Sequence, residues 1–321
     1  MALEQGSALY AGSVSKATIY EIEAGTGLTW APHFRTETLV DRKPRQLTKA
    51  KHAGNPITEN VPNPRDADFT GTPTVTIDGR QLTVSELMVK DKIALQEWKE
   101  TFPEYQPTGN NSNLAANPKV AAAFFNLVMN ATKTQINELH SLGDAALIAP
   151  NSLRFYDGLI TLILADADAT QVGTPAVLTA SNILDKVYEL RSAIEPRLRN
   201  KANLKFFCSY ADYDLYDIAR RKSQTQLAET DLQGSGVLPQ SLGSRINIIP
   251  IEGIPKDFIF ATIASSGADS NLVQGVWVDS EEEVLNVYRS EPADQEIKYV
   301  MRFDMGVQYV TGDDIWYLNN V

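Results

Sequence analysis

The stretch EIKYVMRFDMGVQYVTGDDIWYL, residues 296–318, decides how the rest of the chain is interpreted. Apolar side chains occupy every second position from Ile297 to Tyr309, and charged or polar side chains fill most of the positions between them. A period of two is typical of a β-strand with one buried face. At about 3.3 Å per residue such a strand would run roughly 40 Å, well beyond the usual five or six residues. The sequence therefore predicts a long ribbon close to its C-terminal end.

A long helix is predicted before this ribbon. Asn117 and Pro118 supply an N-cap and a first helical residue, and Gly143 supplies the stop. Between them, apolar residues recur at a spacing of three to four from Val120 to Leu142. About 25 residues at ~1.5 Å each make a helix of roughly 37 Å. We expect the helix and the ribbon to form one elongated layer.

The residues between the helix and the ribbon alternate helical and strand-like patterns. A helical pattern from Ile183 to Ile194 stops at Pro196. It is followed by the strand-like run LKFFCS, the helical pattern YADYDLYDIARR, and the strand-like runs INIIPI, FIFAT and GVWV. Such alternation is typical of an α/β or α+β domain, here spanning about residues 176–280. The two ends of the chain therefore flank an inserted domain.

The first part of the chain has a different composition. Residues 1–74 are rich in Gly, Pro, Thr and charge, and they are too poor in apolar residues to build a core of their own. An extended arm lying on another surface is the economical interpretation. Two strand-like runs then flank Asp78 and Gly79, a dipeptide suited to a hairpin turn, before a helical pattern that ends near Trp98. These patterns predict a projecting hairpin followed by a short helix.

Composition excludes several classes of protein. The formal net charge of −11 argues against nucleic-acid binding through the overall field of the chain. Residues 41–52 differ, with five Lys and Arg against one acid, and are read either as a solvated loop or as an inward-facing arm near polyanion. The longest apolar run is about half the length that crosses a bilayer, and the first residues lack a signal-peptide pattern. We expect a cytosolic chain.

Few residues suggest a redox or metal site. The one cysteine, Cys208, lies in the apolar run LKFFCSY, so a buried structural thiol is expected. The three histidines, His33, His52 and His140, share no metal-ligand spacing. No zinc site and no cofactor are predicted.

The strongest enzyme signal is LITLILADADAT. An apolar run followed by Asp166 and Asp168 resembles the strand and DxDxT motif of haloacid-dehalogenase-type phosphatases, in which the first aspartate attacks phosphorus. GDDI, residues 312–315, would stand for the magnesium-binding acids. In that family the nucleophile strand opens the domain, whereas 165 residues precede Asp166 here. A phosphatase that uses Asp166 and Asp168 is one alternative.

The order of the pieces resembles another family, the major capsid proteins of tailed bacteriophages with the Hong Kong 97-type fold, in the branch found in phages of Bacteroidetes hosts. The segments that carry the resemblance are LTVSELMVKDKIALQEWKETF, PKVAAAFFNLVMNATKTQINELHSLGD, FYDGLI, LTASNILDKVYELRSAIEPRLRNKANLKFFCSYADYDLYDIA, INIIPIEGIPKDFIFAT and MRFDMGVQYVTGDDIWYL. Together they cover most of residues 82–318.

The resemblance implies an α+β fold in five parts. They are an N-terminal arm (1–66), an extended loop with a short helix (67–100), a peripheral domain with a long spine helix (101–175), an inserted axial domain (176–280) and the C-terminal ribbon of the peripheral domain (281–321).

The resemblance also implies a structural function without an enzyme activity. Copies of the chain would form hexamers and pentamers of an icosahedral virion capsid, assembled in the host cytoplasm. Partners would be portal and scaffolding or head-decoration proteins and packaged double-stranded DNA, held without sequence specificity. The candidate contacts between copies are Trp30, Arg42, Arg45, Asp78, Gly79 and Arg80. Encapsulins, which share the fold but form cargo-loaded compartments, are a further alternative.

Overall fold

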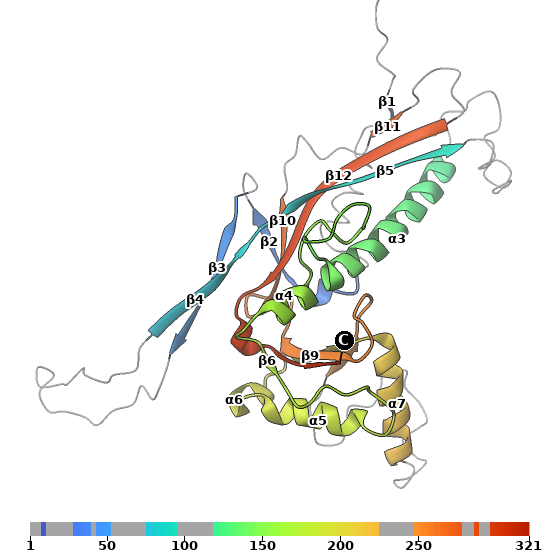
Figure 1. Ribbon diagram of the computed structural model, residues 1–321. Helices are drawn as coiled ribbons and strands as arrows, with labels where there is room; N and C mark the ends of the chain where they lie inside the picture. The colour runs from blue at the N-terminus through green and yellow to red at the C-terminus, as the bar shows by residue number, and fades with distance from the viewer. Residues whose placement is uncertain are drawn as a thin grey trace, which may run out of the picture.

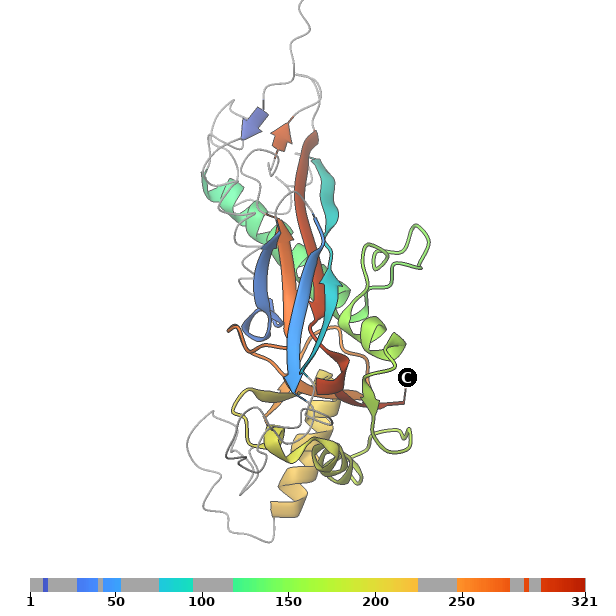
Figure 2. The same ribbon diagram turned by 90° about the vertical axis from the view of Figure 1, so that its left-hand side faces the viewer.

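The computed structural model describes residues 8–10, 28–39, 43–52, 75–94, 118–224, 247–277, 286–288 and 296–320. An upper part, made of strands and one long helix, stands on a lower block of helices around a second sheet, and a two-stranded arm projects to one side (Figure 1). Turned by 90°, the strands of the upper part form a narrow layer (Figure 2). No helix among the described residues is both long and apolar enough to cross a membrane.

The predicted ribbon is confirmed as the central strand of the upper sheet. β12, Glu296–Tyr309, has 14 residues and pairs antiparallel with β5, Ser85–Ala94, along one side. On its other side it pairs with two shorter strands. Successive pairings in the upper sheet connect β1 (Ala8–Tyr10), β11 (Asn286–Tyr288), β12, β10 (Leu272–Trp277) and β2 (Arg35–Leu39), and β5 joins the sheet by its pairing with β12.

The predicted long helix is also confirmed. α3, Pro118–Leu142, has 25 residues and runs alongside β5 and β12 (Figure 1). Ile136 and Leu139 of the helix and Phe303 of β12 belong to one buried cluster, so the apolar face of the helix covers the apolar face of the ribbon. The period of 3.6 residues gives the helix one apolar face, and the period of two gives the ribbon another. These two faces pack against each other in this layer.

The lower sheet is covered on both faces. Its order is β6 (Thr170–Gln171), β13 (Trp316–Asn319), β9 (Phe258–Ile263), β7 (Leu204–Cys208) and β8 (Ile248–Pro250). Every residue of β9 is buried, because Phe258 and Phe260 face the cluster under α3 while Ile259, Ala261 and Ile263 face a second cluster. That second cluster contains residues of α5 (Ile183–Ala193), α6 (Pro196–Arg199) and α7 (Tyr210–Gln224).

The division of the chain differs from the expected boundaries in two places. β10 lies inside the range expected for the axial domain, yet it pairs with β12 and β2 of the upper sheet. β13 follows the ribbon, yet it pairs with β9 of the lower sheet. The chain passes from the lower sheet to the upper sheet between β9 and β10, and back to the lower sheet between β12 and β13. Each sheet therefore contains a strand from the segment expected to complete the other.

The projecting hairpin is built from other residues than those predicted. β3, Arg45–His52, pairs antiparallel with β4, Val75–Leu82, and we call these two strands the arm. Asp78 and Gly79 lie opposite Lys49 and Thr48 in mid-strand, so the predicted turn is wrong. A Cβ on Gly79 would lie 1.9 Å from the Leu47 carbonyl oxygen, so this glycine permits a close approach of the two strands.

The predicted short helix is wrong over residues 85–94, which form strand β5. Its expected end near Trp98 lies outside the described residues. Leu87 and Val89 alternate with Met88 and Lys90, and pairing with β12 selects this period of two over the helical spacing.

Part of the expected N-terminal arm belongs to the core of the subunit. Trp30 precedes the short 3₁₀ helix η1, Ala31–His33, and its side chain is 0% exposed. Its ring lies 5.3 Å from that of Phe207 and 5.4 Å from that of Phe34. The indole Nε1 donates a hydrogen bond to Ser141 Oγ at 3.0 Å. Because this side chain is enclosed by its own chain, we remove Trp30 from the candidate contacts between copies.

Candidate assembly surfaces

The arm has one face turned toward its own subunit and one turned away. Side chains alternate across a strand. The inner face carries two buried leucines and three cations: Arg45, Leu47, Lys49, Arg80 and Leu82. The side chains that the structure describes on the outer face, apart from Gly79, are exposed and uncharged: Gln46, Thr48, Ala50, Ile77 and Gln81.

Arg80 binds a site at the end of α4, Leu159–Ala165. Its Nη2 lies 2.5 Å from Asp166 Oδ2 and 3.8 Å from Asp168 Oδ2. Its guanidinium carbon lies 4.6 Å from the ring centroid of Tyr309, in cation–π geometry. The Tyr309 hydroxyl donates a hydrogen bond to Asp166 Oδ2 at 2.7 Å. The Asp166 carboxylate therefore has a cation and a hydroxyl donor on the same oxygen.

Burial and the neighbouring groups together shift the pKa values of Asp166 and Tyr309. Burial alone would raise the pKa of Asp166, but hydrogen bonds from Tyr309, from the Asp168 amide and from Arg80, together with the Arg80 charge, lower it below its ordinary value. Burial raises the pKa of Tyr309, and the hydrogen bond to Asp166 raises it further. At neutral pH the site therefore consists of a carboxylate, a guanidinium and a neutral phenol.

Two further ion pairs bind the inner face. Lys49 Nζ pairs with Asp314 of the 3₁₀ helix η6, Gly312–Asp314. Arg45 Nη1 lies 2.6 Å from Glu37 Oε2 on β2. Three cations of the arm thus reach acids on three separate elements of the body.

The phosphatase alternative lacks its geometry. Leu159–Ala165, the expected nucleophile strand, is helix α4. The structure does bring Asp166 close to the 312–315 segment, since a Cβ on Gly312 would lie 2.1 Å from Asp166 Oδ2. However, the group that pairs with Asp166 and Asp168 is the Arg80 guanidinium. Within the described ranges no group of three or more His, Cys, Asp or Glu side chains is placed to hold a metal ion.

The remaining predicted contact residues are placed as follows. Arg45 and Arg80 pair with acids of their own chain, as described above. Asp78 and Gly79 lie within β4, where the Asp78 side chain is outside the description. Arg42 is outside the described residues. Ile77, which the sequence did not single out, is an apolar residue of the arm with 74% exposure.

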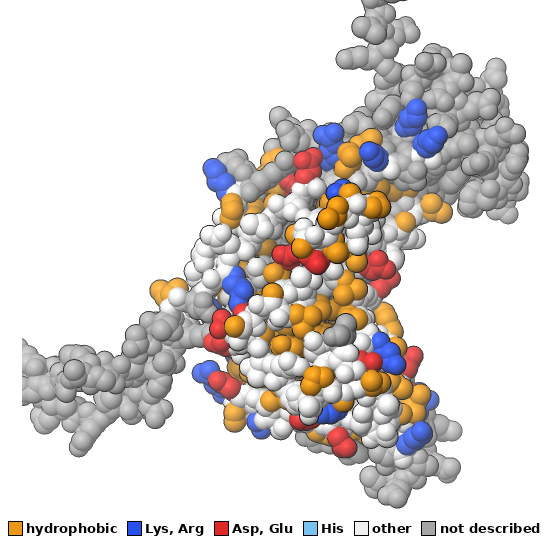
Figure 3. Space-filling view, viewed as in Figure 1, with side chains coloured by type: hydrophobic (Ala, Val, Ile, Leu, Met, Phe, Trp, Pro, Cys, Tyr) orange, Lys and Arg blue, Asp and Glu red, His pale blue; other side chains and the backbone are white. Residues whose placement is uncertain are grey.

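A second candidate surface is the side of the β5–β12 ribbon that faces away from α3. Cross-strand pairing places Lys92 opposite Lys298, and on the same side Lys90 lies opposite Val300 and Arg302 opposite Met88. Figure 3 shows Lys and Arg side chains gathered over the upper end of this ribbon. Glu86 and Asp304 pair on the same side further along the two strands, so this side of the ribbon carries charges of both signs.

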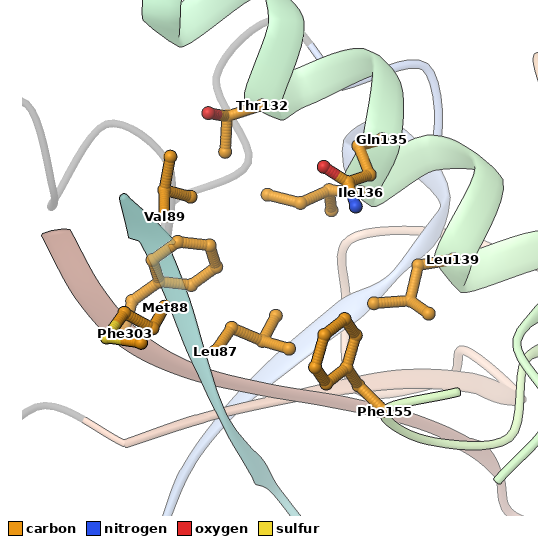
Figure 4. A pocket seen from close by; sticks show the side chains of 9 residues that line it. All are labelled: Leu87, Met88, Val89, Thr132, Gln135, Ile136, Leu139, Phe155 and Phe303. Atoms are coloured by element: carbon orange, nitrogen blue, oxygen red, sulfur yellow. The ribbon is translucent and has the colours of Figure 1, made fainter. Parts of the chain in front are cut away.

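The groove between α3 and the ribbon is too small for a ligand. Figure 4 shows its lining, which is mostly apolar: Leu87, Met88, Val89, Thr132, Gln135, Ile136, Leu139, Phe155 and Phe303. Its cavity measures about 40 Å³. Sites for small molecules are typically about 300–1,000 Å³. The groove is a small gap left where the helix packs against the sheet.

Cys208 and two of the histidines are buried. Cys208 is 1% exposed, as predicted, and burial raises the pKa of its thiol. His140 is 0% exposed, its Nδ1 lies 2.5 Å from the Tyr156 hydroxyl, and burial lowers its pKa to about 3. Burial, and then the charge of Lys205, lower the pKa of His33 to about 4. The His52 side chain lies outside the description.

Comparison with known proteins adds the fold family. No family model matches the chain, and no curated protein matches it. A chain of the satellite phage P4 procapsid is 11% identical over 95% of this chain and 99% of its own, with a TM-score of 0.55. A chain of the Gordonia phage Cozz structure is 9% identical over 99% and 90%, with a TM-score of 0.51.

A third similar structure is that of the cyanophage A-1(L) capsid asymmetric unit. Its chain is 12% identical over 90% of this chain and 91% of its own, with a TM-score of 0.50. These likenesses extend over nearly the whole length of both partners. The chain has the α+β Hong Kong 97-type capsid fold, as the sequence predicted.

Proposed function

We propose that the chain is the major capsid subunit of a tailed bacteriophage and that its copies form the hexamers and pentamers of an icosahedral head. The observation that carries the proposal is the arm. Its outer face covers nothing in the described part of its own subunit and carries Ile77 at 74% exposure. A projecting ribbon with a neutral, partly apolar face is suited to lie on a second copy.

The rest of the molecule supports the same function. A narrow layer of helix on sheet, joined to a second sheet, presents long edges to neighbours (Figures 1 and 2). The same fold occurs, over nearly the full chain, in structures of a phage procapsid and of a phage capsid. A branch near phages of Bacteroidetes hosts remains a prediction from the sequence.

The net charge of the chain bears on how the proposed head would hold DNA. A net charge of −11 per copy opposes strong attraction of nucleic acid. Double-stranded DNA would therefore be retained by enclosure, without sequence specificity. The proposal includes a portal protein, scaffolding or head-decoration proteins, assembly in the cytoplasm of a bacterial host, and a final location in the virion.

The experiment is expression of the chain in bacteria, followed by gradient sedimentation and negative-stain microscopy of the heavy fractions. We expect closed, regular shells, either from the chain alone or after co-expression with a scaffolding protein. Shells that contain one bound host or neighbouring-gene protein at fixed stoichiometry would favour the encapsulin-like alternative. Only monomers under both conditions, with magnesium-dependent phosphatase activity that Asp166→Asn abolishes, would overturn the proposal.

A further inference from the structure

We infer that three ion pairs across the inner face of the arm set the direction in which it projects, with Asp166 as the central anchor. The pairs are Arg45–Glu37, Lys49–Asp314 and Arg80–Asp166. The direction of the arm is a property of the single chain. Its consequence, that the arm reaches the next copy at a defined angle, rests on the proposed function.

The first argument is the pattern along the two strands. Cations alternate with leucines on the inner face, so that Leu47 lies between Arg45 and Lys49, and Leu82 follows Arg80 on the same side of β4. Leu47 and Leu82 are 2% and 0% exposed, in a small cluster with Leu39, Val273 and Val310. The leucines hold the base of the arm against the body, and the cations extend the contact outward along it.

The second argument is the position of the acids. Glu37 lies on β2 of the upper sheet, Asp166 follows α4, and Asp314 lies in the turn that leads to β13 of the lower sheet. Their side chains are 18%, 6% and 10% exposed, so they are fixed within the body. An arm bound at three separated points cannot swing about any one of them.

The third argument is that the Arg80 site is the most fully built of the three. The guanidinium is held by Asp166, by the more distant Asp168 and by the face of the Tyr309 ring. Tyr309 is 0% exposed and belongs to the central strand β12, so it is a rigid support. An ion pair with a stacked, buried support is better ordered than an exposed pair between two mobile side chains.

This arrangement explains the residues that resemble a phosphatase motif. Asp166 follows α4 directly, and its Oδ1 accepts a hydrogen bond from the Asp168 amide at 3.1 Å, which leaves Oδ2 for Arg80 and Tyr309. Asp168 is 59% exposed and contributes charge at 3.8 Å. The acids therefore act as positioning residues for the arm.

The experiment measures the direction of the arm in unassembled subunits. Spin labels are attached to Ala50→Cys, on the outer face, and to Ala193→Cys, at the exposed end of α5. The natural Cys208 is 1% exposed and is not labelled under native conditions. Pulsed electron–electron double resonance then gives the distribution of distances between the label on the arm and the label on α5. The matched control is Arg197→Gln, which removes an exposed pair with Glu195 that involves no residue of the arm.

We expect a narrow distribution in the parent protein and in Arg197→Gln. We expect a clearly broadened or shifted one in Arg80→Gln combined with Lys49→Gln. Asp168→Asn should change it little and Asp166→Asn should change it strongly. If the double variant fails to fold, the distribution in the folded Asp166→Asn protein decides, because this substitution removes the charge that Arg80 binds.

A distribution that stays narrow in the folded double variant, or in folded Asp166→Asn when the double variant does not fold, would overturn the inference and assign the direction of the arm to the leucine cluster. The measurement uses free subunits. A chain that keeps its arm direction but never forms shells would contradict the proposed function and leave this inference standing.

Discussion

Trp30 shows how one residue ties a polar segment to the body of the molecule. Its indole packs against Phe207 of the lower sheet and donates to Ser141 at the end of α3. We expect Trp30→Ala to lower the free energy of unfolding by about 3–5 kcal/mol, because it opens a cavity in the core. Trp30→Phe, which loses the hydrogen bond to Ser141, should cost about 1–3 kcal/mol.

Urea unfolding of purified subunits checks this prediction. Tyr188→Ala is the control, since this aromatic residue is 51% exposed and should change stability by about 0.5 kcal/mol or less. Equal effects at Trp30 and Tyr188 would show that Trp30 does not serve as a core residue.

The buried histidines predict a dependence of stability on pH. In the unfolded chain an imidazole has a pKa of about 6.5, but in the folded chain burial lowers the pKa to about 4 for His33 and about 3 for His140. Below pH 6.5 the unfolded state therefore binds protons that the folded state does not. Stability should fall as pH decreases, by up to about 1.4 kcal/mol per pH unit for each imidazole.

The measurement is the free energy of unfolding at several pH values between 5 and 7, above the range in which the lowered pKa of Asp166 contributes. His140→Gln removes one of the two protons, so it should reduce the slope by up to about 1.4 kcal/mol per pH unit. An unchanged slope in this variant would contradict the burial of a neutral His140.

At the scale of elements, the crossing of β12 with the bend between β4 and β5 depends on a glycine. A Cβ on Gly306 would lie 2.0 Å from the Thr83 carbonyl oxygen, a backbone atom that cannot move aside alone. We expect Gly306→Ala to displace the bend and to destabilise the subunit by about 1–3 kcal/mol. Gly267→Ala is the control, because the nearest atom is the Ser265 Oγ at 3.6 Å. A melting temperature equal in the two variants would refute the close approach.

The outer face of the arm predicts a separation of folding from assembly. Ile77 is 74% exposed, so Ile77→Asp should change subunit stability by only about 0.5 kcal/mol. If a second copy buries this side chain, losing it costs the interface about 1.5–3 kcal/mol, and each 1.4 kcal/mol is a tenfold loss of association. Particle yield should therefore collapse in Ile77→Asp and persist in Ile77→Val. Equal yields would remove Ile77 from the contact.

Local patterns account for the elements that could be predicted. In β12 and in α3 a regular apolar pattern continues over many residues and has clear ends. The structure has both elements where the sequence predicts them. The Asp78–Gly79 turn was wrong because this local turn signal was overridden by pairing with Lys49 and Thr48, some thirty residues earlier. Residues 85–94 satisfy both a helical and a strand spacing, and only the partner strand β12 decides between them.

At the scale of the whole molecule, the ion pairs of the arm could not be predicted. Arg80 and Asp166 are 86 positions apart in the chain, and Lys49 and Asp314 are 265 apart. The sequence showed the acids as a possible catalytic motif and the cations as a basic segment, with no local signal that joins them. The turn between β12 and β13 brings Asp314 to Lys49, and the end of α4 brings Asp166 to Arg80.

The central claim is that this fold builds a shell in which the arm of one copy lies on another. Electron cryomicroscopy of the assembled particles tests it most directly. The account predicts closed shells in which the outer face of the arm around Ile77 is covered by a neighbouring copy. Closed shells with that face open to solvent, or a chain that forms no closed particles at all, would contradict it.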